Sequence, residues 1–580
     1  MKIFENATTE QEIPEEWEKV LIKSVIKKKP HSEMKNKRGL FLTSIVGKAY
    51  ERIIKERNDE RLWNGISESQ TGGKKKRGTI DNIMILLSVV ERNKYLGKET
   101  YITYTDIEKC FDNIWLDDAI VDIWRSGMHL RDAIMVKKMN EKARATVLTP
   151  FGETEEFQLT STVKQGGVSS VGLCCSSVGR VNQVGRKIVT MYGPEIEINA
   201  QAYVDDVESA GSQKVANNTI FNSSIIEDEK QLTINTDAGK SALMVVHGTE
   251  GNKSVTETVK RGRISLVKEY NFLGTWIDEL AEYGINTAKM KGKVQAMINT
   301  TKQVGSKHEV GRLAIQTRLR LYEVAIIHSV LHHVEAFPVV REEEVKELEK
   351  TQHNILVQLL ELPQSTPYAG VLMETGMWMM EARVHYRRLM LYHRLEHSDE
   401  RRTIKSIIKF QKNYEKRPGT WYSETQRIIK LYKIETDVMK VLKSQWKREV
   451  KAKISLVNQQ KVVQRCKEGV KTRFVCDEEW GRKSYVDNLP IAEVKRVMKL
   501  RLCMVPLPCN QRSKEQQQGC RLCGVKSKIR MEHYFLCTRL ARLRRSMNVL
   551  PTDTDKVCQG PPIVMIKEAK YLEAVSKLTI

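Results

Sequence analysis

Short runs of apolar positions at either helical or strand spacing mark the first hundred residues. Residues 13–28 begin with an amphipathic pattern at Pro14, which predicts a short helix that leads into a strand over 20–26. Residues 36–57 predict a turn followed by a helix, and residues 79–92 predict a further helix that starts at a Thr-x-Asp segment. The apolar face of the helix within 36–57 is expected to contain Ile45, Val46, Tyr50, Ile53 and Ile54.

Strands and helices are expected to alternate over the next hundred residues. Residues 101–105 are β-branched and aromatic, which predicts a strand ending on Asp106, with a helix from about Trp115. A β-hairpin is expected with arms near 195–203 and 206–210. Interleaved elements of this kind are typical of an α+β fold in which helices pack on a sheet. The other elements expected are short β segments within 144–163 and a helix of small residues over 169–190.

Beyond about residue 280 the pattern becomes helical. One stripe at helical spacing stops at Leu362 and Pro363, and core packing explains it better than a binding site does. Residues 443–473 contain ten basic side chains against two acidic ones. A solvated helix face would explain this segment, and so would a track for nucleic acid. The apolar stripe consists of Val345, Leu348, Ile355, Leu356, Leu359 and Leu360.

The overall composition and charge narrow the class of protein. The chain has 580 residues, 41% of them hydrophobic and 29% charged, which are proportions of a globular protein long enough for several domains. Its formal net charge of +24 attracts polyanions, and release of condensed counterions makes nucleic acid the leading partner. Solubility alone, or a ribosome-like or membrane-surface partner, would also account for the charge.

The sequence gives no sign of export or membrane insertion. No run of about 18 apolar residues is present, so no transmembrane helix is expected. The first residues lack a signal peptide, and we expect the protein in a reducing compartment, in the nucleus, the cytoplasm or both. The scattered cysteines are expected to be small core residues, namely Cys110, Cys174, Cys175, Cys466 and Cys476.

Three carboxylates are candidates for metal ligands. Asp205 and Asp206 occupy the predicted hairpin turn, and Asp106 closes another predicted strand. Adjacent carboxylates repel, which favours a bound cation, although Asp-Asp pairs are also common in ordinary turns. Three carboxylates on neighbouring strands could hold two Mg²⁺ ions about 3.5–4 Å apart, as in-line phosphoryl transfer requires.

Sequence blocks around these carboxylates resemble the reverse transcriptases of non-LTR (LINE-type) retrotransposons. Tyr-Val-Asp-Asp at 203–206 resembles the Y-x-D-D signature, and the segment 106–112 is similar to the D-x-E-K-A-F-D block. Between them, Gln-Gly-Gly-Val-Ser-Ser at 165–170 resembles the Q-G-x-x-x-S block. Further similar blocks begin at Arg38, Gln70, Gly239 and Phe272, so the resemblance covers roughly residues 13–280.

The resemblance implies a right-hand polymerase followed by nucleic-acid-binding regions. Fingers would occupy 13–100, a palm with the catalytic site 101–280, and a helical thumb-like region 281–400. A basic helical nucleic-acid-binding region over 401–510 and a zinc knuckle with its tail over 511–580 would follow. The implied activity is that of an RNA-directed DNA polymerase, a nucleotidyltransferase that uses an RNA template, a DNA primer or target, dNTPs and two Mg²⁺ ions.

Individual residues take roles from the same resemblance. Asp106, Asp205 and Asp206 would be the metal ligands. Lys240 would donate a proton to pyrophosphate, unless it is a solvated surface lysine. Phe111 would be the steric gate against a ribose 2′-hydroxyl, unless it is a core aromatic. The implied contacts to the incoming nucleotide are Gln165 and Gly166 beside it and Arg38, Lys74 and Arg77 at its triphosphate.

A second group of potential ligands lies near the C-terminus. Cys520 and Cys523 open a knuckle turn, and His533 and Cys537 would lie on one face of a helix, which together form a Cys₃His set for structural Zn²⁺. Chance spacing is the alternative. The set resembles the CCHC knuckle that follows the polymerase in many non-LTR elements. The basic residues expected to face phosphates after it are Arg539, Arg542, Arg544 and Arg545.

The sequence departs from the family at several points. Gly73 stands where the family usually has phenylalanine, and prolines expected after the Gln-Gly pair are absent, with Val168 and Ser170 nearby. About a dozen residues precede the first block and 43 follow Cys537, so no endonuclease domain is expected, and no RNase H carboxylates are apparent. These departures favour an alternative, a catalytically weak or inactive nucleic-acid-binding remnant. A splicing factor similar to group II intron maturases is a further alternative, against which the cysteine cluster argues.

Overall fold

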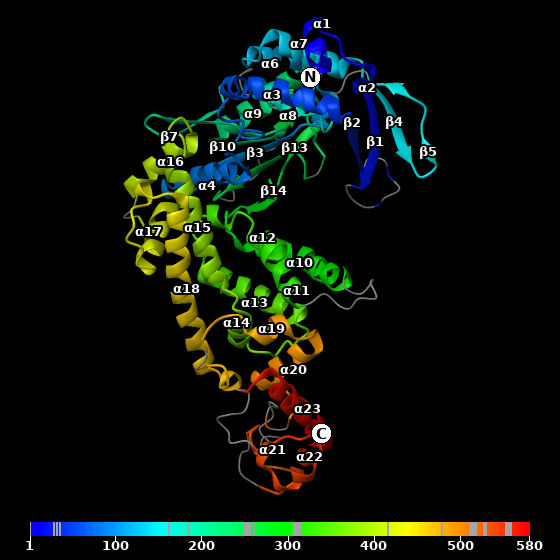
Figure 1. Cartoon of the computed structure of the whole chain (residues 1–580). Helices are drawn as coiled ribbons and strands as arrows, with labels where there is room; N and C mark the ends of the chain where they lie inside the picture. The colour runs from blue at the N-terminus through cyan, green and yellow to red at the C-terminus, as the bar shows by residue number, and fades with distance from the viewer. Residues whose placement is uncertain are drawn as a thin grey trace. The chain divides into compact units, whose positions relative to one another are not determined.

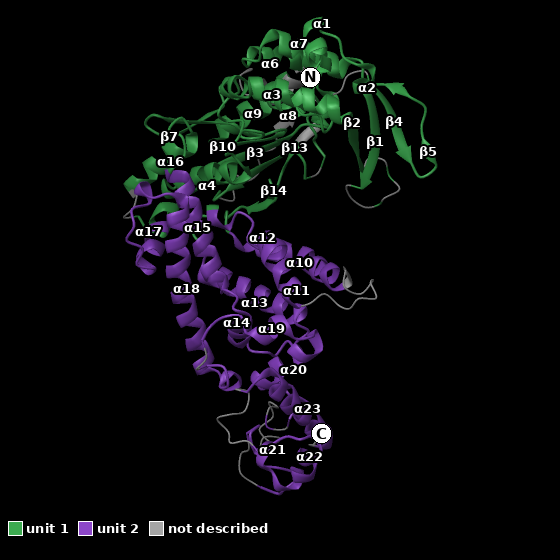
Figure 2. Ribbon diagram, in the orientation of Figure 1, with its two compact units in different colours: residues 1–282, 336–339, 397–424 green, residues 283–335, 340–396, 425–580 purple. Residues whose placement is uncertain are grey.

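The computed structural model divides the chain into two compact units (Figure 1, Figure 2). Unit 1 contains residues 1–282, 336–339 and 397–424, and unit 2 contains residues 283–335, 340–396 and 425–580. No helix among the described residues is long and apolar enough to cross a membrane. The structure describes residues 2–26, 30, 33, 36–159, 163–181, 186–230, 232–237, 239–248, 257–259, 262–304, 315–414, 417–476, 479–507, 509, 519–525, 530–551 and 560–579.

The N-terminal sheet of unit 1 is built around β1, which continues directly from helix α2 as the sequence predicts. β1 pairs antiparallel with β2 and parallel with β4. The prediction of a turn at residues 37–43 is wrong, because exposure alternates along this segment with the period of two that defines a strand. The elements are α2 (Glu15–Glu18), β1 (Lys19–Ile26), β2 (Lys37–Thr43), β4 (Arg144–Thr149), β5 (Gly152–Glu153) and β6 (Phe157–Gln158).

The central sheet of unit 1 has β3 in its interior. β10 and β11 both pair antiparallel with β3, and the register sets Asp206 directly opposite Asp106. Every residue of β3 before Asp106 is buried, which confirms the strand predicted from its β-branched and aromatic residues. Within the described residues the sheet order is β12 (Glu257–Val259), β13 (Gly262–Leu266), β11 (Ala242–Val246), β3 (Thr100–Asp106), β10 (Asp206–Gly211) and β9 (Gln201–Tyr203).

The predicted hairpin is present with a shorter first arm. β9 pairs with β10 across a turn of Val204 and Asp205, whereas β8 (Ile196–Asn199) pairs with β7 (Val189–Gly193). The chain changes partner at the buried Ala200. The helix expected over 169–190 ends earlier, because α8 stops at Val181 and β7 has begun by residue 189; residues 182–185 lie outside the described part. A further hairpin joins β14 (Glu269–Phe272) to β15 (Thr275–Asp278).

The helices of unit 1 confirm most of the predicted helical segments. In α3, Tyr50 and Ile54 are buried as expected, but Ile45, Val46 and Ile53 are exposed. The inward face uses the polar residues Glu51 and Asn58 instead, which an apolar pattern does not reveal. The helices are α1 (Lys2–Glu10), α3 (Ile45–Gly65), α4 (Thr79–Tyr95), α5 (Cys110–Asn113), α6 (Leu116–Arg125), α7 (Leu130–Glu141), α8 (Ser170–Val181), α9 (Gln213–Lys230) and α16 (Thr403–Gln411).

Unit 2 is helical, as the pattern beyond residue 280 predicts. The apolar stripe of α13 is buried in the core apart from its first residue, Val345, which is half-buried. The long α18 buries one stripe at intervals of four residues, from Trp446 to Cys466, and packs against α14 and α15. Helices of this unit include α10 (Gly284–Val304), α11 (Ile315–Leu321), α12 (Ile327–Val330), α13 (Glu342–Leu359), α14 (Tyr368–Thr375), α15 (Met380–Glu396), α18 (Lys443–Glu468), α19 (Ser484–Asn488), α20 (Ile491–Arg501), α21 (His533–Leu536), α22 (Ala541–Ser546) and α23 (Pro562–Thr579); α17 (Trp421–Leu431) begins in unit 1 and ends in unit 2.

Replacing Trp446 by alanine is expected to destabilise unit 2 by about 3–5 kcal/mol, because a large buried side chain is lost and a cavity remains. Trp446 is fully buried, and its indole N–H donates to the carbonyl of Leu389 on α15 at 2.9 Å. Urea unfolding followed by circular dichroism measures the change. Leu456→Ala on the same helix is the control, since Leu456 is 54% exposed, and equal losses from both substitutions would contradict the described packing of α18.

Candidate active site

Three carboxylates meet at one end of the central sheet. Asp106 is the last residue of β3, Asp206 is the first residue of β10 and faces it across the ladder, and Asp205 lies in the turn before β10. All three are half-buried. The strand ends predicted from the sequence therefore bring these three side chains together.

Like charge and burial make this place unfavourable for negative charge. Burial raises the pKa of Asp206 from 3.8 to about 6, and the charges of Asp205 and Asp106 add to this effect. Burial also raises the pKa of Asp205, as does the charge of Asp106, whereas its own backbone N–H and the cations of Arg38 and Lys240 lower it. A bound cation would relieve both the lost hydration and the mutual repulsion.

Lys240 lies at the carboxylates and neutralises one of them. Its ammonium nitrogen is 3.0 and 3.2 Å from the two carboxylate oxygens of Asp106. The carbonyl of Lys240 accepts a hydrogen bond from the hydroxyl of Tyr270, whose ring stacks on Tyr104 with 4.0 Å between the centroids. Ser241 accepts a hydrogen bond from the backbone N–H of Asp106 at 3.0 Å. Lys240 thus has a charged partner at the site, and its role as a proton donor stays a prediction.

The Gln-Gly loop before α8 is held from two sides. Gln165 donates from its side-chain nitrogen to the carboxylate of Asp112 at 2.7 Å. Gly166 has φ +103°, a conformation that disfavours any L side chain. On the other side, Glu51 of α3 accepts from the backbone N–H groups of Val168 and Ser169 at 3.0 and 2.8 Å. Sequence reasoning missed Glu51, because its partners are more than one hundred residues away.

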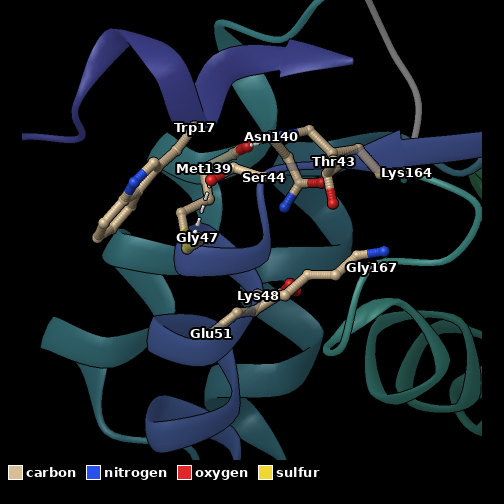
Figure 3. Close-up of a pocket in the computed structure, with 10 residues that line it drawn as sticks. All are labelled: Trp17, Thr43, Ser44, Gly47, Lys48, Glu51, Met139, Asn140, Lys164 and Gly167. Atoms are coloured by element: carbon tan, nitrogen blue, oxygen red, sulfur yellow. Dashed lines mark hydrogen bonds between the residues drawn. The ribbon is translucent and has the colours of Figure 1, made fainter. Parts of the chain in front are cut away.

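A small pocket lies behind this loop, between α2, α3 and α7 (Figure 3). Glu51, Lys164 and Trp17 are among its lining residues. The ammonium of Lys164 is buried and donates to the carbonyl of Met139. Burial lowers the pKa of Lys164 to about 8, and the nearby carboxylates of Glu51 and Glu18 oppose that shift. Lys164 and Glu51 therefore form a buried polar support under the Gln-Gly loop.

The basic residues expected at the triphosphate have different surroundings. Arg38 is exposed on β2, and its charge lowers the pKa of Asp205. Lys74 is buried and donates to the carbonyls of Ile66 and Ser67 at 2.8 and 3.0 Å. Its ammonium therefore stabilises the turn that precedes it. Arg77 pairs with Glu68 at 2.5 Å. These contacts make Lys74 a structural residue rather than an open phosphate ligand, and they leave Arg38 as the exposed cation near the carboxylates.

Phe111 lies in α5, directly after the strand that ends on Asp106. Its side chain is partly buried and packs against the core cluster that contains Cys110, Cys174 and Cys175. Its backbone carbonyl accepts from the N–H of Val163, just before the Gln-Gly loop. These contacts fit a core aromatic residue, and they equally fit a residue beside the active site. The role of Phe111 as a steric gate therefore stays a prediction.

Comparison with known proteins identifies this region. Residues 26–277 match the family described as "Reverse transcriptase (RNA-dependent DNA polymerase)". The chain contains a reverse transcriptase domain. No curated protein matches the chain.

Solved structures similar to the chain include telomerases of two yeasts. Apo telomerase from Candida tropicalis truncated from its C-terminal domain is 13% identical, with 47% of this chain and 55% of that chain covered and a TM-score of 0.34. The chain thus spans about half the length of this telomerase. Apo telomerase from Candida tropicalis is 12% identical, with 76% and 70% covered and a TM-score of 0.37. Telomerase from Candida albicans in complex with a fragment of telomeric RNA is 10% identical, with 67% and 66% covered and a TM-score of 0.32. At these scores no property of a telomerase transfers to this chain.

Outside the reverse transcriptase domain, the four cysteine and histidine ligands of the C-terminal cluster converge. Their ligand atoms all lie within 4.8 Å of one another. The Cys520 and Cys537 sulfurs are 3.9 Å apart, and the Cys523 sulfur is 3.4 Å from Nε2 of His533. Tetrahedral zinc with bonds of about 2.3 Å to sulfur and 2.0–2.1 Å to nitrogen requires separations of about 3.8 and 3.6 Å. The donor set and its spacing therefore fit zinc.

The cluster is built into the helices around it. Cys520 and Gly524 close a tight turn, since the N–H of Gly524 donates to the carbonyl of Cys520 at 2.9 Å. Arg544, expected to face phosphates, is buried and donates to the carbonyl of Cys537 at 2.6 Å, so that expectation is wrong. Arg473 pairs with Glu532 at 3.1 Å. The other three arginines expected to face phosphates, Arg539, Arg542 and Arg545, are exposed.

Replacing Asp206 by asparagine is expected to raise the melting temperature of the metal-free protein at pH 8. The pKa of Asp206 is about 6 in the folded protein and about 3.9 in the unfolded chain. Ionisation of Asp206 therefore begins to favour the unfolded state as the pH rises above about 4, and this destabilisation is complete above about 6. The gain should therefore shrink as the pH falls below 6. Differential scanning fluorimetry at pH 5 and pH 8 measures it.

Asp117→Asn is the matched control for this measurement. Asp117 is exposed and pairs with Lys137 at 2.8 Å, so its loss should change the melting temperature little, and not upward. A melting temperature of Asp206→Asn below that of the unaltered protein at pH 8 would contradict the described repulsion among the three carboxylates.

Proposed function

We propose that the chain is an RNA-directed DNA polymerase of a non-LTR retrotransposon. The observation that carries this proposal is the meeting of Asp106, Asp205 and Asp206 at one end of the central sheet, inside a reverse transcriptase domain. Reverse transcriptase domains in general use Mg²⁺, and half-buried carboxylates offer the hard oxygens that Mg²⁺ prefers. The blocks around Asp106 and the cysteine cluster after the domain support the non-LTR assignment by resemblance.

Three carboxylates would hold two Mg²⁺ ions. The bound ions would activate the primer 3′-hydroxyl and neutralise the leaving pyrophosphate. Asp106 and Asp206 supply oxygens from neighbouring strands, and Asp205 supplies them from the turn. Lys240, whose ammonium is 3.0 Å from Asp106, is the proposed proton donor to pyrophosphate.

The substrate would lie between the carboxylates and the Gln-Gly loop. Gly166 lacks a side chain, which allows the nucleotide to approach the backbone closely. Gln165 is fixed by Asp112 at the end of α5, and Phe111 beside it is the proposed gate against a 2′-hydroxyl. Arg38 is the proposed triphosphate ligand, because it is exposed and its charge reaches Asp205.

The proposed regions follow the polymerase plan. We assign fingers to 13–100, the palm to 101–280, a thumb-like region to 281–400, a basic region that ends at 510 and the zinc module to 511–580. The end of the main segment of unit 1 at Glu282 supports the boundary after the palm. Residues 397–424 belong to unit 1, which argues against starting a separate nucleic-acid-binding region at residue 401.

A nucleic-acid track is proposed for the first half of α18. Three of the ten basic residues in 443–473 form ion pairs: Lys461 with Glu381, Arg465 with Glu349 and Arg473 with Glu532. Four others are exposed and have no acidic partner among the described residues: Lys443, Lys447, Arg448 and Lys451. Phosphates of an RNA or DNA strand are the anions these four would bind.

Gly73, one of the departures that favour an inactive remnant, also has an explanation in local packing. A side chain at Gly73 would begin only 2.6 Å from the ring of Trp63 and 2.7 Å from Val171. We propose that Gly73 reflects this packing, and the inactive remnant stays the alternative that primer extension tests.

Primer extension decides between the polymerase and the remnant. With a DNA primer annealed to an RNA template, dNTPs and Mg²⁺, the protein should extend the primer. Asp205→Asn should lower the rate by about a thousandfold or more, because a lost metal ligand removes several kcal/mol of charge stabilisation. Asp117→Asn should extend normally. Extension by both the unaltered protein and Asp205→Asn, or by neither, would refute the proposal.

The C-terminal cluster is expected to hold one equivalent of Zn²⁺ as a structural ion. Inductively coupled plasma mass spectrometry of the purified protein should find it, and Cys520→Ser should lose it. Cys476→Ser is the control that should keep the ion, since Cys476 is not one of the four clustered ligands. Absence of zinc from protein purified without chelators would refute the assignment.

A further inference from the structure

The turn that carries Asp205 and Asp206 contains a backbone conformation that its residue disfavours. Val204 has φ +61°, in the left-handed region. A β-branched side chain there is a true outlier, and such a conformation persists only where the surroundings enforce it. Neighbouring residues must therefore stabilise this backbone conformation of Val204, which joins the first arm of the hairpin to the two carboxylates.

The side chain of Gln70 stabilises the conformation of Val204 through two hydrogen bonds. Its amide nitrogen donates to the carbonyl of Val204 at 2.9 Å, and its amide oxygen accepts from the N–H of Val204 at 2.9 Å. Gln70 is fully buried, so both bonds form away from water. One side chain thus takes both hydrogen-bonding groups of Val204, in the way that a neighbouring strand would.

The backbone on both sides of Gln70 is fixed against the same hairpin. The N–H of Thr71 donates to the carbonyl of Ala202 at 2.9 Å, and the N–H of Ala202 donates to the carbonyl of Ser69 at 2.8 Å. A Cβ on Gly72 would lie 2.4 Å from the nitrogen of Val204, so only glycine permits this approach. The hydroxyl of Thr71 also bonds the side chain of Asn82 on α4, which ties the segment to a long buried helix.

We propose that Gln70 is a positioning residue for the metal-binding turn. By fixing both polar groups of Val204, Gln70 sets the direction in which Asp205 and Asp206 leave the turn. We assign Gln70 no contact with substrate or metal, and its effect would pass through Val204. The inference rests on the proposed function only for its polymerase readout, because metal binding can be measured separately.

Gln70→Met removes both hydrogen bonds to Val204, together with the one that Gln70 accepts from the N–H of Gly72 at 3.0 Å, and it keeps nearly the same side-chain length. We expect the half-saturating Mg²⁺ concentration in primer extension to rise about fivefold or more and kcat to fall about tenfold, while KM for dNTP changes less than about twofold. A merely structural loss would lower the active fraction and leave the Mg²⁺ requirement unchanged. Gln201→Met is the matched control, since Gln201 is buried in the same hairpin but, within the described part of the chain, its amide donates to the carbonyl of Asn199 and not to Val204.

A double-mutant cycle with Val204→Gly isolates the physical cause. Glycine adopts φ above zero without strain, so a turn with glycine in place of Val204 depends less on being held. Loss of Gln70 should then raise the Mg²⁺ requirement of Val204→Gly less than about twofold, compared with about fivefold in the presence of Val204. Equal effects in both backgrounds would overturn the proposal.

Thermal stabilisation by Mg²⁺ separates this inference from the proposed function. If the unaltered protein extends primers and Gln70→Met has the same Mg²⁺ requirement, the polymerase stands and the role of Gln70 is refuted. If no primer is extended, but Mg²⁺ raises the melting temperature of the unaltered protein and of Gln201→Met and not of Gln70→Met, the polymerase proposal fails and the role of Gln70 stands. Equal Mg²⁺ stabilisation of all three refutes it.

Discussion

The antiparallel pairing of β10 with β3 is the constraint on which the site depends. It sets Asp206 opposite Asp106, and because side chains alternate along a strand, a slip of one residue would turn Asp206 to the other face of the sheet. The pairing brings two like charges together at a place that raises the pKa of Asp206. The strand ladder and the cation of Lys240 must offset that repulsion until a metal ion is bound.

Support for this arrangement comes from segments that are remote in sequence. Ser241 accepts from the backbone N–H of Asp106, Gln70 engages Val204, and Glu51 accepts from the N–H groups that precede α8. Each contact joins residues more than one hundred positions apart and gives a partner to a backbone group of a loop or strand end. The hairpin turn therefore depends on the segment before α4, the Gln-Gly loop depends on α3, and the end of β3 depends on the residue before β11.

The spacing of apolar residues correctly predicted the helices and strands that bury an apolar face. It gave partly wrong buried faces where polar residues point into the interior. The strand before Asp106 and the stripe of α13 follow from apolar spacing alone. The face of α3 was predicted only in part, because Tyr50 and Ile54 are buried but Glu51 also faces the interior, where it binds backbone groups. Lys74 was assigned to phosphate because the resemblance places it among the basic residues of the fingers, yet its ammonium serves two carbonyls. Local sequence does not identify such distant partners, whereas the convergence of the Cys₃His set could be predicted because its members are close in the chain.

The two proposed cation sites differ in what they require from the protein. Three carboxylates leave coordination positions open for substrate oxygens and water, so Mg²⁺ can enter and leave with each reaction. The Cys₃His set completes a tetrahedron by itself, and its ion would belong to the fold.

The cysteine cluster is also connected to α23. The carbonyl of Tyr534, next to His533, accepts a hydrogen bond from the hydroxyl of Tyr571 of α23 at 2.6 Å, so the cluster and this helix are ordered together. Burial raises the pKa of Cys537 to about 11, which means that metal binding there must displace a proton. If both proposals hold, magnesium dependence would report on catalysis in unit 1 and zinc dependence on the folding of part of unit 2, and the two could be varied independently.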